Sequence, residues 1–233
     1  MKTLLLVVII SLIIYWLYWV FRMRNPFKFT GIFGKKGSGK SSLLTYYALY
    51  YDKTKVIYYD KEEPKFWKKF KKVKMQLYSN TSLYGVDYTR FDPRKLGIDF
   101  YPPEFSVLLI DEMSLFWWSR NFKSLDPRVY QWFVNQRKYK CIVIGFSQTF
   151  NIDKALRETL MDKIYLMKNF LITWSMMRQV DKQQTIKENA LDASSQLSDQ
   201  LSFVSPLVPG ALKFFWLPKY IKYFDTNEKF HVY

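Results

Sequence analysis

The chain has 233 residues, and its 36 lysines and arginines outnumber 20 acidic residues to give a formal net charge of +16. This basic balance argues for an anionic partner, either nucleic acid or the inner leaflet of a membrane, without distinguishing the two. The single cysteine, Cys141, and the single histidine, His231, exclude an internal disulfide, a Cys/His zinc site and a histidine-based catalytic triad within a monomer.

The first predicted element is an apolar helix. Residues 3–21 contain no charged residue, no proline and no glycine. A helix of this length is just able to cross a bilayer core of about 30 Å, and the aromatic residues at its end resemble an interfacial belt. We therefore predict a membrane anchor in residues 1–24, with the basic residues that follow it placing the rest of the chain in the cytoplasm. A buried helix of a soluble protein is the alternative.

A glycine-rich octet comes next. Residues 34–41 read Gly-Lys-Lys-Gly-Ser-Gly-Lys-Ser and fit the pattern G-x-x-x-x-G-K-[ST]. Residues 29–33 are expected to form a short buried strand and residues 42–49 a helix, which is the context of a phosphate-binding loop. Lys40 could reach the β- and γ-phosphates, and the Ser41 hydroxyl could hold Mg²⁺. A glycine-rich turn beside a solvated lysine is the alternative.

The octet and the residue after it therefore predict a site for ATP and Mg²⁺, because glycines let successive backbone N–H groups approach phosphate oxygens. The expected binding residues are Gly34, Lys35, Lys36, Gly37, Ser38, Gly39, Lys40, Ser41 and Ser42.

A lysine-rich stretch follows a second expected strand at residues 56–59. Residues 61–74 carry seven lysines interleaved with Phe66, Trp67 and Phe70. Their spacing predicts a helix with the rings on one face and the lysines on the other. A solvated helix packed by its rings is the simplest interpretation, and a contact with DNA or lipid is the alternative. Residues 91–103 are expected to be an irregular connection.

Two acidic residues follow the next apolar run. Residues 107–110 are all apolar, as a central parallel strand requires, and they precede Asp111 and Glu112. Asp111 is placed to hold Mg²⁺ through its water shell, and Glu112 is placed to orient and polarise the attacking water. This Walker B pattern predicts hydrolysis of ATP. A strand that ends in a solvated acidic turn is the alternative.

A third apolar strand is expected at residues 141–146, with Cys141 as core filling. It ends at Ser147 and Gln148, and Gln148 is a candidate sensor of the γ-phosphate or its water, with a plain strand cap as the alternative. Arg120, Arg137 and Arg157 are candidates for the cation that such a site needs. Arg137 or Arg157 could reach a neighbouring subunit as an arginine finger, or could be a surface arginine.

The domain organisation expected from these patterns has three parts. Residues 1–24 form the membrane anchor, and residues 25–184 form an α/β P-loop ATPase domain with a mainly parallel sheet flanked by helices. Residues 185–233 form a polar linker or exposed helix followed by an aromatic tail, in which prolines interrupt the apolar run and argue against a second span.

The order of these motifs resembles the zonular occludens toxin (Zot) family over about residues 28–170. The resemblance rests on the octet, Asp111-Glu112, the run Asn135-Gln136-Arg137-Lys138, the strand that ends at Ser147-Gln148, and residues 151–157. Lys138 stands where the family has histidine, and the apolar helix precedes the ATPase instead of following it. The resemblance implies an FtsK-HerA-like assembly ATPase of filamentous phages that drives DNA and coat protein out through the host inner membrane.

The function expected from the sequence is therefore a membrane-anchored ATPase motor that acts in a ring of identical copies. Its implied partners are phage single-stranded DNA and coat or channel proteins. A DNA translocase or packaging ATPase without coat assembly is one alternative, and an ATP-gated membrane scaffold without turnover is another. A small-molecule kinase is disfavoured by the apolar helix and by the lack of an evident acceptor site.

Overall fold

A computed structural model of the chain describes residues 2–23, 25–65, 68–118, 125–153, 155–171, 173–187, 196–221 and 223. Its main sheet has nine strands, in the order β10-β9-β8-β1-β7-β6-β4-β5, with β11 also paired to β9. The strands are β1 (Phe29–Phe33), β4 (Gln76–Ser79), β5 (Thr89–Arg90), β6 (Ser106–Ile110), β7 (Ile142–Ser147), β8 (Lys163–Leu171), β9 (Trp174–Lys187), β10 (Gln196–Phe203) and β11 (Leu212–Trp216).

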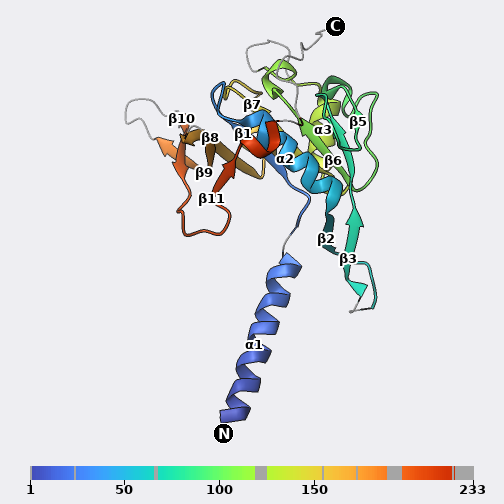
Figure 1. Cartoon of the computed structure of the whole chain (residues 1–233), viewed down its shortest axis with the longest axis vertical. Coiled ribbons are helices and arrows are strands. Elements are labelled where there is room, and N and C mark those ends of the chain that lie inside the picture. Colours follow the sequence, from blue (N-terminus) through green and yellow to red (C-terminus); the bar gives the residue numbers. More distant parts are fainter. Residues whose placement is uncertain are drawn as a thin grey trace.

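The remaining elements are helices, short helical turns and one hairpin (Figure 1). The helices are α1 (Lys2–Met23), α2 (Lys40–Lys53), α3 (Pro127–Asn135) and α4 (Pro218–Ile221). The short turns are η2 (Pro93–Lys95), η3 (Met113–Leu115) and η4 (Leu156–Leu160), and the hairpin consists of β2 (Lys55–Tyr59) and β3 (Phe70–Lys74).

Six strands of the main sheet run parallel, in the order β8-β1-β7-β6-β4-β5. Their carboxyl ends therefore meet at one edge of the sheet. β7 lies between β1 and β6 because it pairs with both of them. Every residue of β6 and β7 is buried, as expected for parallel strands that are covered on both faces. These observations confirm the predicted α/β fold with a mainly parallel sheet.

Helices cover both faces of this sheet. α2 packs Leu43 and Leu44 against one face, in a cluster that includes Leu109 of β6. α3 packs Phe133 against the other face, in a cluster that includes Leu108. Neighbouring residues of a strand point to opposite faces, so one continuous apolar run supplies both cores. The buried Cys141 belongs to the second cluster, which confirms its predicted role as core filling.

β9 extends the sheet beyond its parallel part. It pairs antiparallel with β8 on one side and with β10 and β11 on the other. The polar linker or exposed helix predicted at residues 185–202 was therefore wrong for the described residues, which lie in β9 and β10. Strands near the edge of an antiparallel sheet tolerate polar side chains because backbone pairing supports them. Residues 188–195 and 224–233 lie outside the described part.

The prediction of a helix at residues 61–74 was also wrong. β3 pairs antiparallel with β2, and along β3 exposed and half-buried residues alternate. The alternation of burial from Phe70 to Lys74 has the period of a strand, and the ring spacing in the sequence did not indicate it. Phe66 and Trp67 lie outside the described residues. The strand predicted at residues 56–59 is confirmed as β2.

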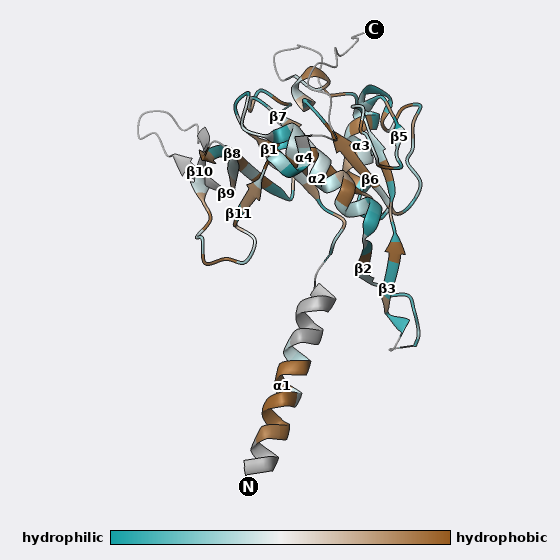
Figure 2. Ribbon diagram, viewed as in Figure 1, coloured by the Kyte–Doolittle hydropathy of each residue, from teal (hydrophilic) through white to brown (hydrophobic). Residues whose placement is uncertain are grey.

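α1 projects away from the rest of the molecule, and the described part of its surface is apolar (Figures 1 and 2). Its apolar side chains between Leu6 and Trp16 are 45 to 63% exposed. Within the described residues, the structure has no helix with the length and apolar character needed to cross a membrane. Of the predicted span, the side chains of residues 3–5 and 17–21 lie outside the described part.

Candidate functional site

The glycine-rich octet forms a loop between β1 and α2 at the carboxyl edge of the sheet. The Gly34 N–H donates to the Ser147 carbonyl oxygen at 3.1 Å, which ties the loop to the neighbouring strand β7. Gly39 has φ 90° and is the residue before the first turn of α2. Only glycine adopts this conformation without strain. α2 has no acidic residue in its first turn, so its N-terminal N–H groups face the loop without a competing negative charge.

Lys40 lies under this loop and is only 8% exposed. Its ammonium group donates to the Gly34 carbonyl oxygen at 2.7 Å and to the Lys35 carbonyl oxygen at 3.1 Å. Burial lowers the pKa of Lys40, and the negative charges of Glu112 and Asp111 oppose part of that shift. The lysine and both carboxylates of the Walker B pattern are therefore close enough to act on one ligand.

The hairpin of β8 and β9 holds the outer side of the loop. Asn169 donates through Nδ2 to the Gly37 carbonyl oxygen at 2.8 Å, and the Ser175 hydroxyl donates to the Ser38 carbonyl oxygen at 2.7 Å. Since the C=O and N–H of a trans peptide point in opposite directions, the bond from Ser175 directs the Gly39 N–H away from β9. Sequence reasoning missed this support, because residues 132 to 137 positions apart make these contacts.

One buried group of the loop favours a bound phosphate. The Ser38 hydroxyl is buried and has no hydrogen-bond partner among the described residues. A buried polar atom of this kind is uncommon and costs free energy, which a ligand oxygen would recover. Ser41 and Ser42, in the first turn of α2, are half-buried, and Lys35 and Lys36 are exposed at the rim of the loop. These residues fit the phosphates of a bound nucleotide, and the roles of Ser41 and Asp111 in holding Mg²⁺ stay predictions.

The Walker B residues follow β6 at the same edge. Asp111 is 8% exposed, and its backbone is held by the side chain of Asn80, which follows β4. Asn80 Oδ1 accepts from the Asp111 N–H at 2.7 Å, and Asn80 Nδ2 donates to the Asp111 carbonyl oxygen at 3.0 Å. Sequence reasoning missed Asn80 as well as Asn169 and Ser175. A polar residue shortly after the apolar residues of a parallel strand was the sequence signal that could have indicated Asn80.

Glu112 is fixed by donors from two elements. Its Oε1 accepts from the Ser114 hydroxyl at 2.5 Å and from the Gln148 N–H at 3.2 Å. The Ser147 hydroxyl lies 3.2 Å from the same oxygen and 3.0 Å from the Thr149 carbonyl oxygen, and it shares its one hydrogen between them. The residue has φ 51°, a conformation that a non-glycine residue adopts only at a cost and that is frequent at functional sites. Its Oε2 has no partner among the described residues and remains available to a water molecule.

Gln148 stands where the sequence places it, at the end of β7 between the octet and the Walker B residues. Its backbone N–H holds Glu112, and its side chain is exposed. Gln148 also lines a pocket of about 610 Å³ beside the loop, together with Phe33, Lys36 and Phe150. Its role as a sensor stays a prediction, but its position is the one that role requires.

The two described arginine candidates lie at opposite edges of the sheet. Arg157 donates to the carbonyl oxygen of Phe150 at 2.7 Å, so it braces the loop that follows Gln148. Arg137 forms an ion pair with Asp162, whose other carboxylate oxygen accepts from the N–H of Phe29 at the start of β1. The structure therefore does not bring Arg137 to the octet of its own chain. Arg120 lies outside the described residues.

No protein-family model and no curated protein matches this sequence. Solved structures with a similar fold include the N-terminal domain of zonular occludens toxin from Neisseria meningitidis, with 16% identity, a TM-score of 0.46, and coverage of 75% of this chain and 93% of that one. The Zot family suggested by the motif order is thus among the structural neighbours.

The genome packaging NTPase B204 of Sulfolobus turreted icosahedral virus 2, in complex with ATP-γS, has 13% identity and a TM-score of 0.43, over 67% of this chain and 94% of that one. EssC (ATPases 2 and 3) from Geobacillus thermodenitrificans has 10% identity and a TM-score of 0.39, over 76% of this chain and 39% of that one. These likenesses concern the fold only.

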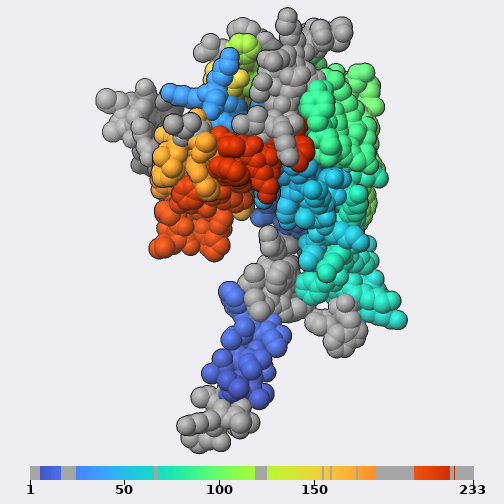
Figure 3. Space-filling view, in the orientation of Figure 1, coloured from blue at the N-terminus to red at the C-terminus, as the bar shows by residue number. Residues whose placement is uncertain are grey.

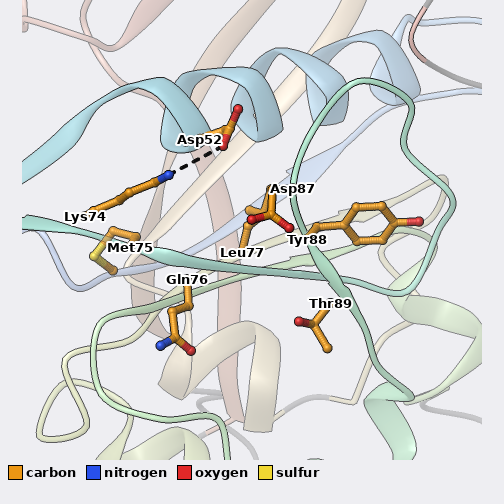
Figure 4. A pocket seen from close by; sticks show the side chains of 8 residues that line it. All are labelled: Asp52, Lys74, Met75, Gln76, Leu77, Asp87, Tyr88 and Thr89. Carbon is orange, nitrogen blue, oxygen red and sulfur yellow. Dashed lines mark ion pairs between the residues drawn. The ribbon is translucent and has the colours of Figure 1, made fainter.

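A separate pocket of about 270 Å³ lies between the end of α2 and strands β4 and β5 (Figure 4). Asp52 and Lys74 face each other there at 4.0 Å. None of the predicted site residues lines this pocket. The carboxyl edge of the sheet, where Lys40, Asp111, Glu112 and Gln148 meet, is therefore the candidate functional site.

Proposed function

We propose that the chain is an ATPase. The observation that carries the proposal is the placement of Glu112, whose Oε1 is held by hydrogen-bond donors at the edge of the sheet where Lys40 and Asp111 also lie. A carboxylate held in this way can orient a water molecule and accept its proton, which is the chemistry that hydrolysis of a phosphoanhydride needs.

The other residues of the site divide the remaining tasks. Lys40 exchanges its contacts with the loop carbonyl oxygens for contacts with the β- and γ-phosphates. Ser41 and Asp111 are the residues that would hold Mg²⁺, which neutralises charge on the phosphate oxygens when bound. Gln148 is positioned to contact the water or the γ-phosphate. Asn169 and Ser175 keep the loop open for the phosphates by holding its carbonyl oxygens on the outer side.

Two substitutions test this activity in the purified chain. Lys40→Ala should lose both ATP binding and hydrolysis, whereas Glu112→Gln should keep ATP binding and lose hydrolysis. Lys95→Ala, an exposed lysine of η2, is the matched control and should behave as the wild type. A Glu112→Gln rate equal to that of the wild type, with binding lost in Lys40→Ala, would favour the ATP-gated scaffold. Unchanged rates in both variants would refute the ATPase assignment.

We further propose that this activity drives filamentous phage assembly and export from the host inner membrane, with the ATPase domain in the cytoplasm. The order of the motifs supports the role, and the exposed apolar side chains of α1 support membrane anchoring, because exposed apolar surface of this extent is normally covered by a partner or lipid. Phage single-stranded DNA, coat or channel proteins and further copies of this chain are the proposed partners.

Membrane anchoring and export are tested separately. The full chain should stay with host membranes after alkaline extraction, and an Ile9→Arg/Ile13→Arg variant should be released, because charged side chains in an apolar span are costly. Glu112→Gln should abolish virion release from a host that supplies all other phage proteins. Stimulation of ATP hydrolysis by DNA in the absence of coat protein would favour a DNA translocase or packaging ATPase instead.

The arginine that acts between copies is proposed to be Arg157, with Arg137 as the alternative. Arg157 lies at the same edge of the sheet as the octet, through its contact with Phe150. Mixing Arg157→Ala with Lys40→Ala chains should restore part of the hydrolysis if one copy completes the site of its neighbour. Restoration only with Arg137→Ala would assign the role to the arginine at the opposite edge.

A further inference from the structure

A groove of about 370 Å³ lies at the edge of the sheet opposite the candidate site, where the parallel strands begin. Four lysines line it, together with six tyrosines and one phenylalanine, and no acidic residue does. The lysines are Lys28, Lys55, Lys163 and Lys213. The groove therefore combines positive charge with aromatic surface.

The β2–β3 hairpin forms one wall of this groove and presents a mixed basic and apolar face. Along its register Lys55 stands opposite Lys74, Ile57 opposite Lys72, and Tyr59 opposite Phe70. Ile57 is 49% exposed and Phe70 is 36% exposed. Lys55 and Lys74 are like charges placed opposite each other, an arrangement that an anion bound to this face would stabilise.

The lysines of the hairpin region outnumber its acidic residues. Residues 52–74 contain nine lysines and four acidic residues, a net charge of +5. Lys71 is paired with Asp60 at 2.7 Å and with Glu63 at 3.3 Å, and Lys74 reaches Asp52 at 4.0 Å (Figure 4). Within the described part of the chain, Lys55 and Lys72 form no ion pair. The exposed face thus retains positive charge beside apolar side chains.

The position of the groove indicates which anion would occupy it. Asn25 and Pro26, the first described residues after α1, lie at its rim. The hairpin and α1 both extend from the same side of the sheet (Figures 1 and 3). Lysines, tyrosines and exposed apolar residues at the base of an apolar helix form the combination that favours the headgroup region of an anionic bilayer.

We propose that this groove and the exposed face of the β2–β3 hairpin bind the anionic phospholipid headgroups of a bilayer. The proposal rests on the proposed membrane anchoring of α1. The contact would hold the carboxyl edge of the sheet away from the bilayer, because the groove and the candidate site lie at opposite edges. ATP and a cytoplasmic substrate would then reach the site without passing the membrane surface.

The test uses the full chain in phosphatidylcholine vesicles with or without phosphatidylglycerol, each containing a lipid with a nitroxide on its headgroup. Ile57→Cys carries a thiol-reactive fluorophore on the hairpin. Cys141 stays unlabelled, because it is buried and burial raises its pKa to about 11. The label should be quenched several-fold more strongly in the anionic vesicles, and salt should reverse the difference. A label at Tyr84→Cys, an exposed position beyond the carboxyl end of β4, should not be quenched.

Charge variants identify the groups responsible. Lys55→Gln/Lys72→Gln should abolish the additional quenching of the Ile57→Cys label. Lys95→Gln/Lys219→Gln removes the same charge from η2 and α4 and should leave the quenching intact. All four lysines are exposed, and the ATPase rate of each variant in detergent should equal that of the wild type. Equal quenching in neutral and anionic vesicles, or no effect of the Lys55/Lys72 change, overturns the proposal.

Alkaline extraction of the same vesicles separates this contact from the anchoring of α1. A chain that stays in the bilayer with an unquenched label overturns the headgroup contact alone. A chain that alkali releases, but that is quenched before release, supports the contact and refutes the anchor. Release without prior quenching overturns both. If a single-stranded oligonucleotide binds the chain with the same dependence on Lys55 and Lys72 while anionic vesicles cause no quenching, the surface is a nucleic-acid site and the proposal fails.

Discussion

Removing the side chain of Asn80 should disturb the proposed Mg²⁺ site through the backbone of Asp111. Asn80→Ala deletes the two hydrogen bonds that hold the N–H and the carbonyl oxygen of Asp111. Both partners are almost fully buried, with exposed fractions of 6% for Asn80 and 8% for Asp111. Each buried polar group left without a partner costs about 1 to 3 kcal/mol, so the loss of partners for two groups should lower the free energy of unfolding by about 2 to 6 kcal/mol.

The activity should change beyond this loss of stability. Groups that orient a metal ligand typically affect metal affinity about 10- to 100-fold, and Asn80 orients the backbone of Asp111. Chemical denaturation measures the first effect, and the Mg²⁺ concentration that gives half-maximal ATP hydrolysis measures the second. Asn135→Ala is the control, because its amide makes one hydrogen bond at the surface, to Gln131, and its loss should cost less than about 1 kcal/mol. A wild-type unfolding midpoint and Mg²⁺ dependence in Asn80→Ala would refute the reasoning.

Three further predictions concern the loop, its lysine and a turn. Ser175→Ala removes the donor to the Ser38 carbonyl oxygen and should weaken ATP binding about fivefold in a fluorescence titration, since one net hydrogen bond contributes about 1 kcal/mol. Unchanged affinity would mean that the loop keeps its shape without the bond from Ser175. Burial lowers the pKa of Lys40, so Lys40 loses its charge at a lower pH than an exposed lysine, and ATP affinity should fall as pH rises through that pKa. Lys40→Arg stays charged and should give a flatter pH profile; equal profiles would contradict the role of the lysine charge. Gly97→Ala should lower the free energy of unfolding by about 2 kcal/mol more than Gly210→Ala. Both glycines have positive φ, but only a Cβ at Gly97 would lie 2.9 Å from a backbone carbonyl oxygen of α3, so equal denaturation midpoints would contradict this clash.

Local motifs gave the sequence-based predictions that the structure confirms. The strand before the octet, the helix after it and the buried strand before Asp111 each depend on neighbouring residues, so their pattern is visible in a short window. The residues that were missed act across long separations. Asn80 holds a residue 31 positions away, and Ser175 holds one 137 positions away. Such contacts depend on sheet order, which a local pattern does not contain.

The lysine-rich stretch shows a different limit. Over five residues, the spacing of Phe70 and the lysines around it fits one side of a helix and one face of a strand about equally well. The choice is made by β2, whose residues from Lys55 to Tyr59 offer a partner for backbone hydrogen bonds. Arg137 is a similar case, because its sequence position before β7 does not reveal that it pairs with Asp162 at the amino edge of the sheet.

Ser147 links the glycine-rich loop to Glu112 of the candidate site. Its carbonyl oxygen accepts from the Gly34 N–H at 3.1 Å, and its hydroxyl lies 3.2 Å from Glu112 Oε1 and 3.0 Å from the Thr149 carbonyl oxygen. A displacement of the loop when phosphate leaves must therefore stretch one of these bonds or carry the tip of β7 with it. The next residues, from Gln148 to Phe150, lead to Arg157. In the proposed ATPase, the departure of phosphate would therefore displace this surface segment, which is where the proposed neighbouring copy would respond.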